Sequence, residues 1–169
     1  NNLKVEKKED FLANFKTAIA STVKSISKID DLEVTFGSNT SSFDKPIVKL
    51  PELENINNKI NYKKVRALAD SESLKFRYSN KKILDSYQPS GDVSKKLYQI
   101  AEKIRYEKLG SQEFEGVKNN IHNYYIERLS GLDLKKNQDK VIEAFENYLR
   151  VNFFNIDNEK SIEKDLTPL

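Results

Sequence analysis

The side chains that could do chemistry in this sequence are its carboxylates, its serines and one histidine, because the chain contains no cysteine. A Ser-His-Asp arrangement would have to use His122, and nothing singles out a serine to partner it. A zinc site needs three or four Cys, His or carboxylate ligands, and His122 is the only imidazole. This histidine is more simply a surface or flanking residue of a helix. We therefore predict no catalytic residue and no metal ligand in this chain.

Nucleotide hydrolysis is disfavoured by the glycine pattern. Only five glycines are present, at positions 37, 91, 110, 116 and 131. None of them fits the Gly-x-x-x-x-Gly-Lys-Ser/Thr spacing that places backbone N–H groups around phosphates. The sequence therefore predicts that any nucleotide chemistry belongs to another protein.

One arrangement of charges stands out on a predicted helix over residues 93–109. Glu107 follows Ile100 by seven positions, so at 3.6 residues per turn it lies at the edge of the apolar face. Arg105 lies on the other flank of that face, and Glu102 precedes it by three, within side-chain reach. The simpler interpretation is an ion-pair network that locks neighbouring helices. The functional alternative is a charged patch that a partner protein recognises.

A basic stretch between Lys59 and Lys82 holds eight Lys or Arg residues against Asp70 and Glu72. With Tyr62 interleaved, this composition is compatible with nucleic-acid binding. The alternative is a solvated helix face with its aromatic residues turned inward. We favour the solvated face, because no RNA- or DNA-binding signature accompanies it.

The elements that must position these side chains are mainly helical. Besides the helix over 93–109, helical spacing covers residues 11–26, 61–88, 117–129 and 141–149. Ser90 or Asp92 can cap the helix that begins near Val93, and Gly110 is expected to end it. In the last helix, which Asn137 or Asp139 can cap, the apolar positions are Val141, Phe145, Tyr148 and Leu149. We expect these to face the core.

One small β element interrupts the helices. Residues 32–37 alternate and carry β-branched side chains, and residues 47–50 form a second short run that ends at Pro51. A polar loop joins them. The predicted fold class is therefore mainly α, a helical domain with one small two-stranded antiparallel β-hairpin near residues 32–50.

Composition limits the class of protein. The chain has 169 residues, is 33% charged and carries a net charge of +3, which does not predict nucleic-acid binding. No apolar run approaches the roughly 20 residues that span a bilayer. The lack of cysteine fits a reducing compartment, so we expect a cytoplasmic protein.

The order of several local motifs resembles the amino-terminal region of the CobT subunit of cobaltochelatase. The motifs are Leu32-Glu33-Val34-Thr35-Phe36, Lys49-Leu50-Pro51, Val65-Arg66-Ala67-Leu68-Ala69-Asp70, Leu74-Lys75-Phe76-Arg77-Tyr78, Pro89-Ser90-Gly91, Glu102-Lys103-Ile104-Arg105-Tyr106-Glu107-Lys108-Leu109-Gly110 and Gly116-Val117 with Asn120. They cover roughly residues 15–130, and their shared order carries the resemblance. The charged residues of these motifs are our candidates for partner binding or structural ion pairs: Arg66, Asp70, Arg77, Glu102, Arg105 and Glu107.

The resemblance implies a non-catalytic module of the ATP-dependent cobaltochelatase of aerobic cobalamin (vitamin B12) biosynthesis, a ligase-type enzyme. In that family CobT pairs with CobS, an AAA+ ATPase, and the pair acts on CobN, which holds cobalt and hydrogenobyrinate a,c-diamide. The complex is implied to use ATP, magnesium and cobalt, with no cofactor in this chain. The implied assembly is a hetero-oligomer without membrane or nucleic acid.

The resemblance also implies domain limits. Residues 1–155 correspond to the helical front domain, and 156–169 to a charged tail leading toward a linker. The family's acidic linker and von Willebrand A domain are absent, so the chain is either a fragment or a shortened relative. Ser79-Asn80 stand where family members usually show His-Asp. Two alternatives remain open: a helical protein-interaction adaptor unrelated to cobalamin, and a weak nucleic-acid binder.

Overall fold

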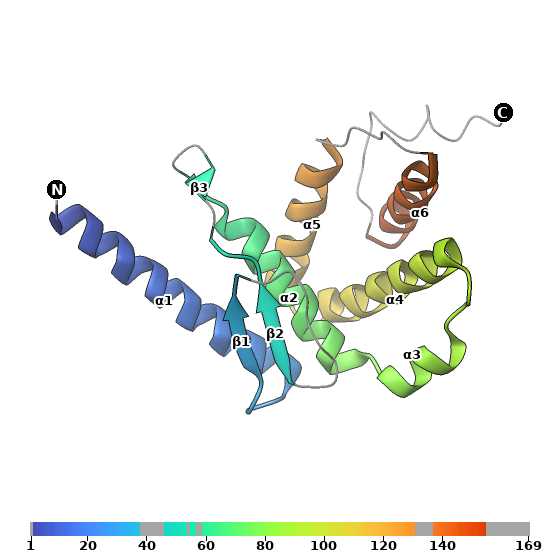
Figure 1. Ribbon diagram of the computed structural model, residues 1–169, viewed down its shortest axis with the longest axis horizontal. Helices are drawn as coiled ribbons and strands as arrows, with labels where there is room; N and C mark the ends of the chain where they lie inside the picture. Colours follow the sequence, from blue (N-terminus) through green and yellow to red (C-terminus); the bar gives the residue numbers. More distant parts are fainter. Residues whose placement is uncertain (1, 38–45, 54, 57–58, 131–136, 155–169) are drawn as a thin grey trace. The chain divides into compact units, whose positions relative to one another are not determined.

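The computed structural model describes residues 2–37, 46–53, 55–56, 59–130 and 137–154. In these residues it contains six helices and two strand pairs (Figure 1). The helices are α1 (Asn2–Ser27), α2 (Tyr62–Tyr78), α3 (Lys81–Tyr87), α4 (Asp92–Glu113), α5 (Glu115–Ser130) and α6 (Asn137–Phe154). The strands are β1 (Glu33–Phe36), β2 (Ile47–Leu50), β3 (Asn55–Ile56) and β4 (Lys59–Ile60). The prediction of a mainly α fold is confirmed.

The chain forms two compact units, residues 1–77 and 78–169, each with its own internal packing. The sequence led us to expect one helical domain over residues 1–155. The charged tail predicted over 156–169 lies outside the described residues. No described helix is long and apolar enough to cross a membrane.

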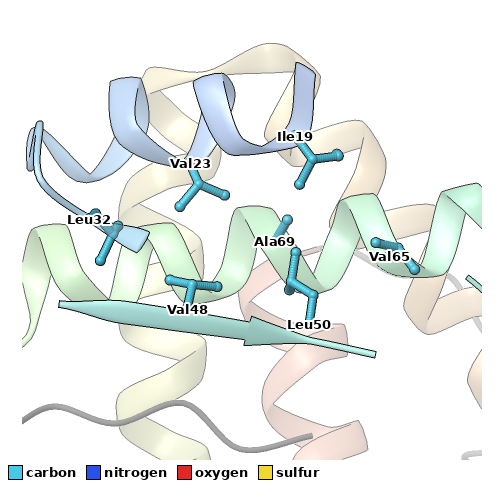
Figure 2. Close-up of a cluster of buried hydrophobic side chains, with 7 residues drawn as sticks. All are labelled: Ile19, Val23, Leu32, Val48, Leu50, Val65 and Ala69. Atoms are coloured by element: carbon cyan, nitrogen blue, oxygen red, sulfur yellow. The ribbon is translucent and has the colours of Figure 1, made fainter. Parts of the chain in front are cut away.

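The first unit is built around a hydrophobic core that gathers side chains from α1, α2 and β2 (Figure 2). Ile19 and Val23 lie one turn apart on α1, so both point to the same side and are almost completely buried. The other core members are Leu32, Val48, Leu50, Val65 and Ala69. The helical spacing read from residues 11–26 predicts the helix and the burial of Ile19 and Ile26, but it includes the exposed Phe11 and misses Val23.

Helix α1 ends at Ser27, just before Lys28 adopts a left-handed backbone conformation. Lys28 has a φ of 59°, and its N–H donates to the carbonyl of Lys24 at 3.0 Å. The Ser27 hydroxyl accepts from the N–H of Ile29 at 3.3 Å. These bonds satisfy backbone groups that the end of a helix would otherwise leave unpaired.

The predicted β-hairpin near residues 32–50 is wrong in its topology. Strands β1 and β2 are both present, but they pair in parallel, with Glu33 opposite Ile47 and Phe36 opposite Leu50. A parallel partner requires a connection that brings the chain back to the starting end of the first strand. The ten residues from 37 to 46 make that connection. The turn-like polarity of this segment suggested a tight reversal, which is the reason for the error.

A second strand pair, β3 with β4, is antiparallel, with Asn55 opposite Ile60 and Ile56 opposite Lys59. Our sequence analysis did not predict it. Two-residue strands are too short to show the alternation of apolar and polar residues on which strand prediction rests.

The second unit contains α3 to α6, and α4 packs against both α5 and α6. Helix α4 begins after Gly91, which takes the N-cap position without a side-chain cap, so neither Ser90 nor Asp92 serves as the predicted cap. Helix α4 also continues through Gly110 to Glu113, contrary to the predicted end. Gly110 is buried inside the helix, and packing of α4 against its neighbours outweighs the low helix propensity of glycine.

Candidate functional site: a buried charge network

The most unusual feature of the second unit is a set of charged side chains around Tyr125, among α4, α5 and α6, of which Glu107, Glu146 and Arg150 are buried and the others half-buried. We call this set the charge network. It consists of Lys103 and Glu107 from α4, Tyr125 and Arg128 from α5, and Glu143, Glu146 and Arg150 from α6. Buried charges are rare because they lose their hydration, and they persist where each is paired.

Arg150 lies at the centre of the network, and its side chain is fully buried. One terminal nitrogen, Nη1, lies 2.8 Å from Oε2 of Glu107, whose side chain is also fully buried. The Nε atom donates to Glu146 Oε1 at 3.0 Å, one helical turn back on α6. The guanidinium carbon stands 3.1 Å from the centroid of the Tyr125 ring, a close cation–π contact. Arg150 thus joins all three helices.

The rest of the network balances the charge. Arg128 on α5 contacts Glu143 at 3.1 Å and Glu146 at 3.4 Å. The Lys103 ammonium stands 5.8 Å from the Tyr125 ring centroid. The network therefore holds three cations (Lys103, Arg128, Arg150) and three carboxylates (Glu107, Glu143, Glu146). Because the two numbers are equal, the network carries no net charge.

Two groups of the network, Tyr125 and Lys103, have pKa values shifted away from neutral pH. Burial raises the pKa of Tyr125 to about 12, and the nearby Glu107 carboxylate acts in the same direction. Burial alone would lower the pKa of Lys103, but the neighbouring Tyr125 and Glu107 outweigh it and raise that pKa. Because Tyr125 keeps its proton at neutral pH, Glu107 is the anion that acts on Lys103 there. Both groups stay protonated, so neither serves as a general base.

Helix α6 turns only part of its apolar pattern inward. We expected Val141, Phe145, Tyr148 and Leu149 to face the core. Phe145 and Leu149 are half-buried, but Val141 and Tyr148 are 56% and 53% exposed, while Glu146 and Arg150 are buried. The ion pairs with α4 and α5 decide which face of α6 turns inward. Burying an arginine without its partners costs more free energy than leaving a valine exposed.

A second polar contact fixes the start of the second unit to α4. Arg105 forms a two-point ion pair with Glu102, both bonds at 2.7 Å, and also donates to the carbonyl of Tyr78 at 2.8 Å. Ser79 donates to the same Glu102 carboxylate at 2.6 Å. The Tyr78 hydroxyl donates to Glu113, the last residue of α4. The predicted proximity of Glu102 and Arg105 is thus seen directly, with Ser79 as an additional donor.

Comparison with known proteins bears on what this arrangement serves. The sequence model of the family described as "Cobalamin biosynthesis protein CobT" matches residues 9–149 of this chain of 169 residues. The chain belongs to the CobT family. No solved structure matches it. The family resemblance drawn from the local motifs is confirmed, and the match includes every member of the charge network except Arg150, which directly follows it.

The remaining candidate residues of this CobT-family chain lie in the first unit. Arg66 is exposed on α2, and Asp70 is buried on the same helix. Arg77 donates to the carbonyl of Ile26, near the end of α1, at 3.0 Å. Whether any of the six candidates binds a partner stays a prediction.

Our sequence analysis missed most of the network. Of its members, only Glu107 was a candidate. Two signals were available: the Glu146–Arg150 spacing of four on one helix, and a lysine at position 103 four residues before Glu107. Neither signal shows that the pairs are buried.

Metal binding has no donor set in the described part of this CobT-family chain. Among those residues, no three His, Cys, Asp or Glu side chains converge closely enough to hold a metal ion. His122 is half-buried on α5.

Proposed function

We propose that this chain is a non-catalytic module of the ATP-dependent cobaltochelatase, which inserts cobalt into hydrogenobyrinate a,c-diamide. In this role it couples an AAA+ ATPase of the CobS type to a chelating subunit of the CobN type, in the cytoplasm. The observation that carries the proposal is the CobT family match over residues 9–149. Membership in this family places the chain in cobalamin biosynthesis.

The charge network supports a mechanical role. A coupling subunit must pass movement from one partner to another without yielding at its own helix contacts. Ion pairs among α4, α5 and α6 oppose sliding, since any shift of α6 would separate Arg150 from Glu107 or Glu146. A separated buried charge costs about 3–5 kcal/mol, so the three helices resist displacement as one body.

The division of labour follows from the same residues. ATP and magnesium belong to the ATPase partner in this proposal, and cobalt is a substrate of the complex. We assign none of them to this chain, because its described residues offer no metal-donor cluster and its sequence has no phosphate-binding glycine loop. Tyr125 and Lys103 hold their protons at neutral pH, which favours a structural use of the network.

Reconstitution tests the proposal. The complete gene product that contains this chain is combined with the ATPase and chelating subunits from the same genome, and cobalt insertion is followed by the visible absorbance of the corrinoid. We expect ATP-dependent insertion that requires all three proteins, and none from the chain alone. Co-purification of the chain with the ATPase subunit is the binding readout.

The control is the same mixture without the chain. Equal cobalt insertion with and without it, together with no co-purification, would contradict the proposal. The helical-adaptor alternative predicts this result.

A further inference from the structure

Helix α3 exposes an apolar pair and buries nothing. Ile83 and Tyr87 are 57% and 75% exposed, and they stand four residues apart, so both lie on one face of the helix. No residue of α3 is buried. A helix of seven residues is too short to be stable in water by its own hydrogen bonds, and most helices gain stability by packing an apolar face. Within α3, Leu84 is half-buried and the other six residues are exposed.

Local contacts alone shape α3. The Asn80 side chain accepts from the N–H of Ile83 at 3.3 Å and caps the first turn. Lys81 pairs with Asp85 at 2.9 Å. The Ser86 hydroxyl bonds back to the carbonyl of Lys82. These contacts preform the helix and leave the Ile83–Tyr87 face open.

Three exposed lysines lie on α3 and in the first turns of α4. Lys82 follows Lys81 at the start of α3, and Lys95 and Lys96 lie in the first turns of α4. Gln99 on α4 bonds to Gln88, the residue after Tyr87, at 3.4 Å. Because Lys95 and Lys96 precede Gln99 by four and three residues, they share its side of α4 and lie toward the end of α3.

These lysines lack the ion pairs that other basic side chains have. Among the described residues, no carboxylate pairs with Lys82, Lys95 or Lys96, whereas Lys81, Arg105 and Arg128 each contact one. Lysines near the start of a helix are also disfavoured by the positive end of its dipole. A cluster of unpaired cations at such positions is stabilised by an anionic partner.

We propose that Lys82, Ile83, Tyr87, Lys95 and Lys96, here called the α3 surface, dock an acidic amphipathic helix of a partner protein. The apolar pair at a spacing of four matches the ridge of a second helix, and Tyr is enriched among residues that dominate binding energy. The three lysines select carboxylates beside that ridge. A second copy of this chain is disfavoured, because two α3 surfaces would bring like charges together.

A nucleic acid would use the lysines for its phosphates and could stack a base on Tyr87, but an aliphatic side chain such as Ile83 contributes nothing to either contact. Ile83 is therefore the residue that separates the two classes of ligand. The inference does not depend on the cobaltochelatase proposal, because any partner with this chemistry satisfies it.

Fluorescence anisotropy with a labelled probe peptide tests the inference on the whole chain. The probe is a helical peptide with leucines at every third or fourth position and glutamates on the flanks; a second peptide carries lysine in place of each glutamate. We expect saturable binding of the acidic peptide that weakens as salt is raised, and no binding of the basic one. The double variant Ile83→Ser/Tyr87→Ser should raise the Kd at least about tenfold. The triple variant Lys82→Glu/Lys95→Glu/Lys96→Glu should do the same.

Each variant has a matched control elsewhere on the chain. Val141→Ser/Tyr148→Ser removes a similarly exposed apolar pair from α6, at 56% and 53% exposure. Lys7→Glu/Lys8→Glu/Lys63→Glu makes the same change in net charge at exposed positions of α1 and α2. We expect both controls to bind the acidic peptide as the unmodified chain does, and circular dichroism to show that all variants keep their helices.

Three results would overturn the inference. The first is no saturable binding of the acidic peptide. The second is an equal loss in the variants and their controls, which would indicate attraction by net charge alone. The third is single-stranded DNA binding that depends on Lys82, Lys95 and Lys96 while the Ile83→Ser/Tyr87→Ser change has no effect on either ligand.

Discussion

Replacing Glu107 with alanine tests whether the charge network holds the second unit together. The Glu107 and Arg150 side chains are both fully buried and lie 2.8 Å apart. Removing the carboxylate leaves three cations against two anions in the network, and Arg150 keeps its ion pair with Glu146 and its contact with the Tyr125 ring. Loss of one member of a buried pair costs about 3–5 kcal/mol. Since a domain is stable by only about 5–15 kcal/mol in total, we expect a large fall in stability.

Urea unfolding measures that fall. Circular dichroism follows the helices, and tyrosine fluorescence follows the surroundings of the eight tyrosines together, because the chain has no tryptophan. The matched control is Glu115→Ala on α5. The Glu115 side chain is 75% exposed and stands 3.9 Å from Lys118. Its removal should change the free energy of unfolding by less than about 1 kcal/mol, as for most surface pairs.

A double substitution separates the ion pair from the space it fills. Glu107→Met with Arg150→Met removes both charges, and Glu146 retains Arg128 at 3.4 Å. We expect the double variant to lose less stability than the sum of the two single variants, by about 0.5–3 kcal/mol. If Glu107→Ala costs no more than Glu115→Ala, the network does not hold the helices and our account of α6 is wrong.

Three further predictions concern single contacts. Burial holds the pKa of Tyr125 at about 12, against about 10 in an unfolded chain. Its contribution to the free energy of unfolding is therefore complete below pH ~10 and falls by about 2–3 kcal/mol as the pH rises toward 12. Tyr125→Phe should remove this part of the alkaline loss of stability, measured by urea unfolding at several pH values. Burial would raise the pKa of Glu102, but hydrogen bonds from Arg105 and Ser79 outweigh it and lower that pKa, so its contribution to stability is present above its unfolded pKa and lost as acid protonates it. Arg105→Gln should move the Glu102 titration upward in an NMR experiment, and an unchanged titration would contradict the pairing. Gly37 has a φ of 99°, so Gly37→Ala should cost about 1–2 kcal/mol in urea unfolding, and no loss would show that this backbone relaxes freely.

Local patterns in the sequence predict much of the helical structure. The i, i+4 and i+7 spacing of apolar residues identifies α1, α4 and α5, and the three-residue spacing of Glu102 and Arg105 identifies their pair. These predictions succeed because each depends on residues within one or two helical turns. The position of Glu107 at an apolar edge was also informative, since its side chain is fully buried.

Features that depend on distant residues were not predictable in the same way. Arg150 follows Glu107 by 43 positions, and no local spacing connects them. Periodicity assigned the inward face of α6 to Val141 and Tyr148, because the method counts apolar residues and cannot see a carboxylate on another helix. The parallel pairing of β1 with β2 likewise depends on the path between them and not on either strand. Tertiary contacts decide these cases.

The burial of Glu146 and Arg150 on α6 affects how the second unit keeps its shape. An apolar seam between helices tolerates small shifts, since one methyl group packs nearly as well as the next. A seam of ion pairs does not, because a shift by one turn would place Arg150 or Glu107 in the interior without its partner. A shift of α6 against α4 would therefore separate the Arg150–Glu107 pair. The same pair fixes where Val141 and Tyr148 emerge on the surface, since they lie on the face of α6 opposite to Arg150. A part that transmits force needs this property: its surface features must keep their positions while its partners move.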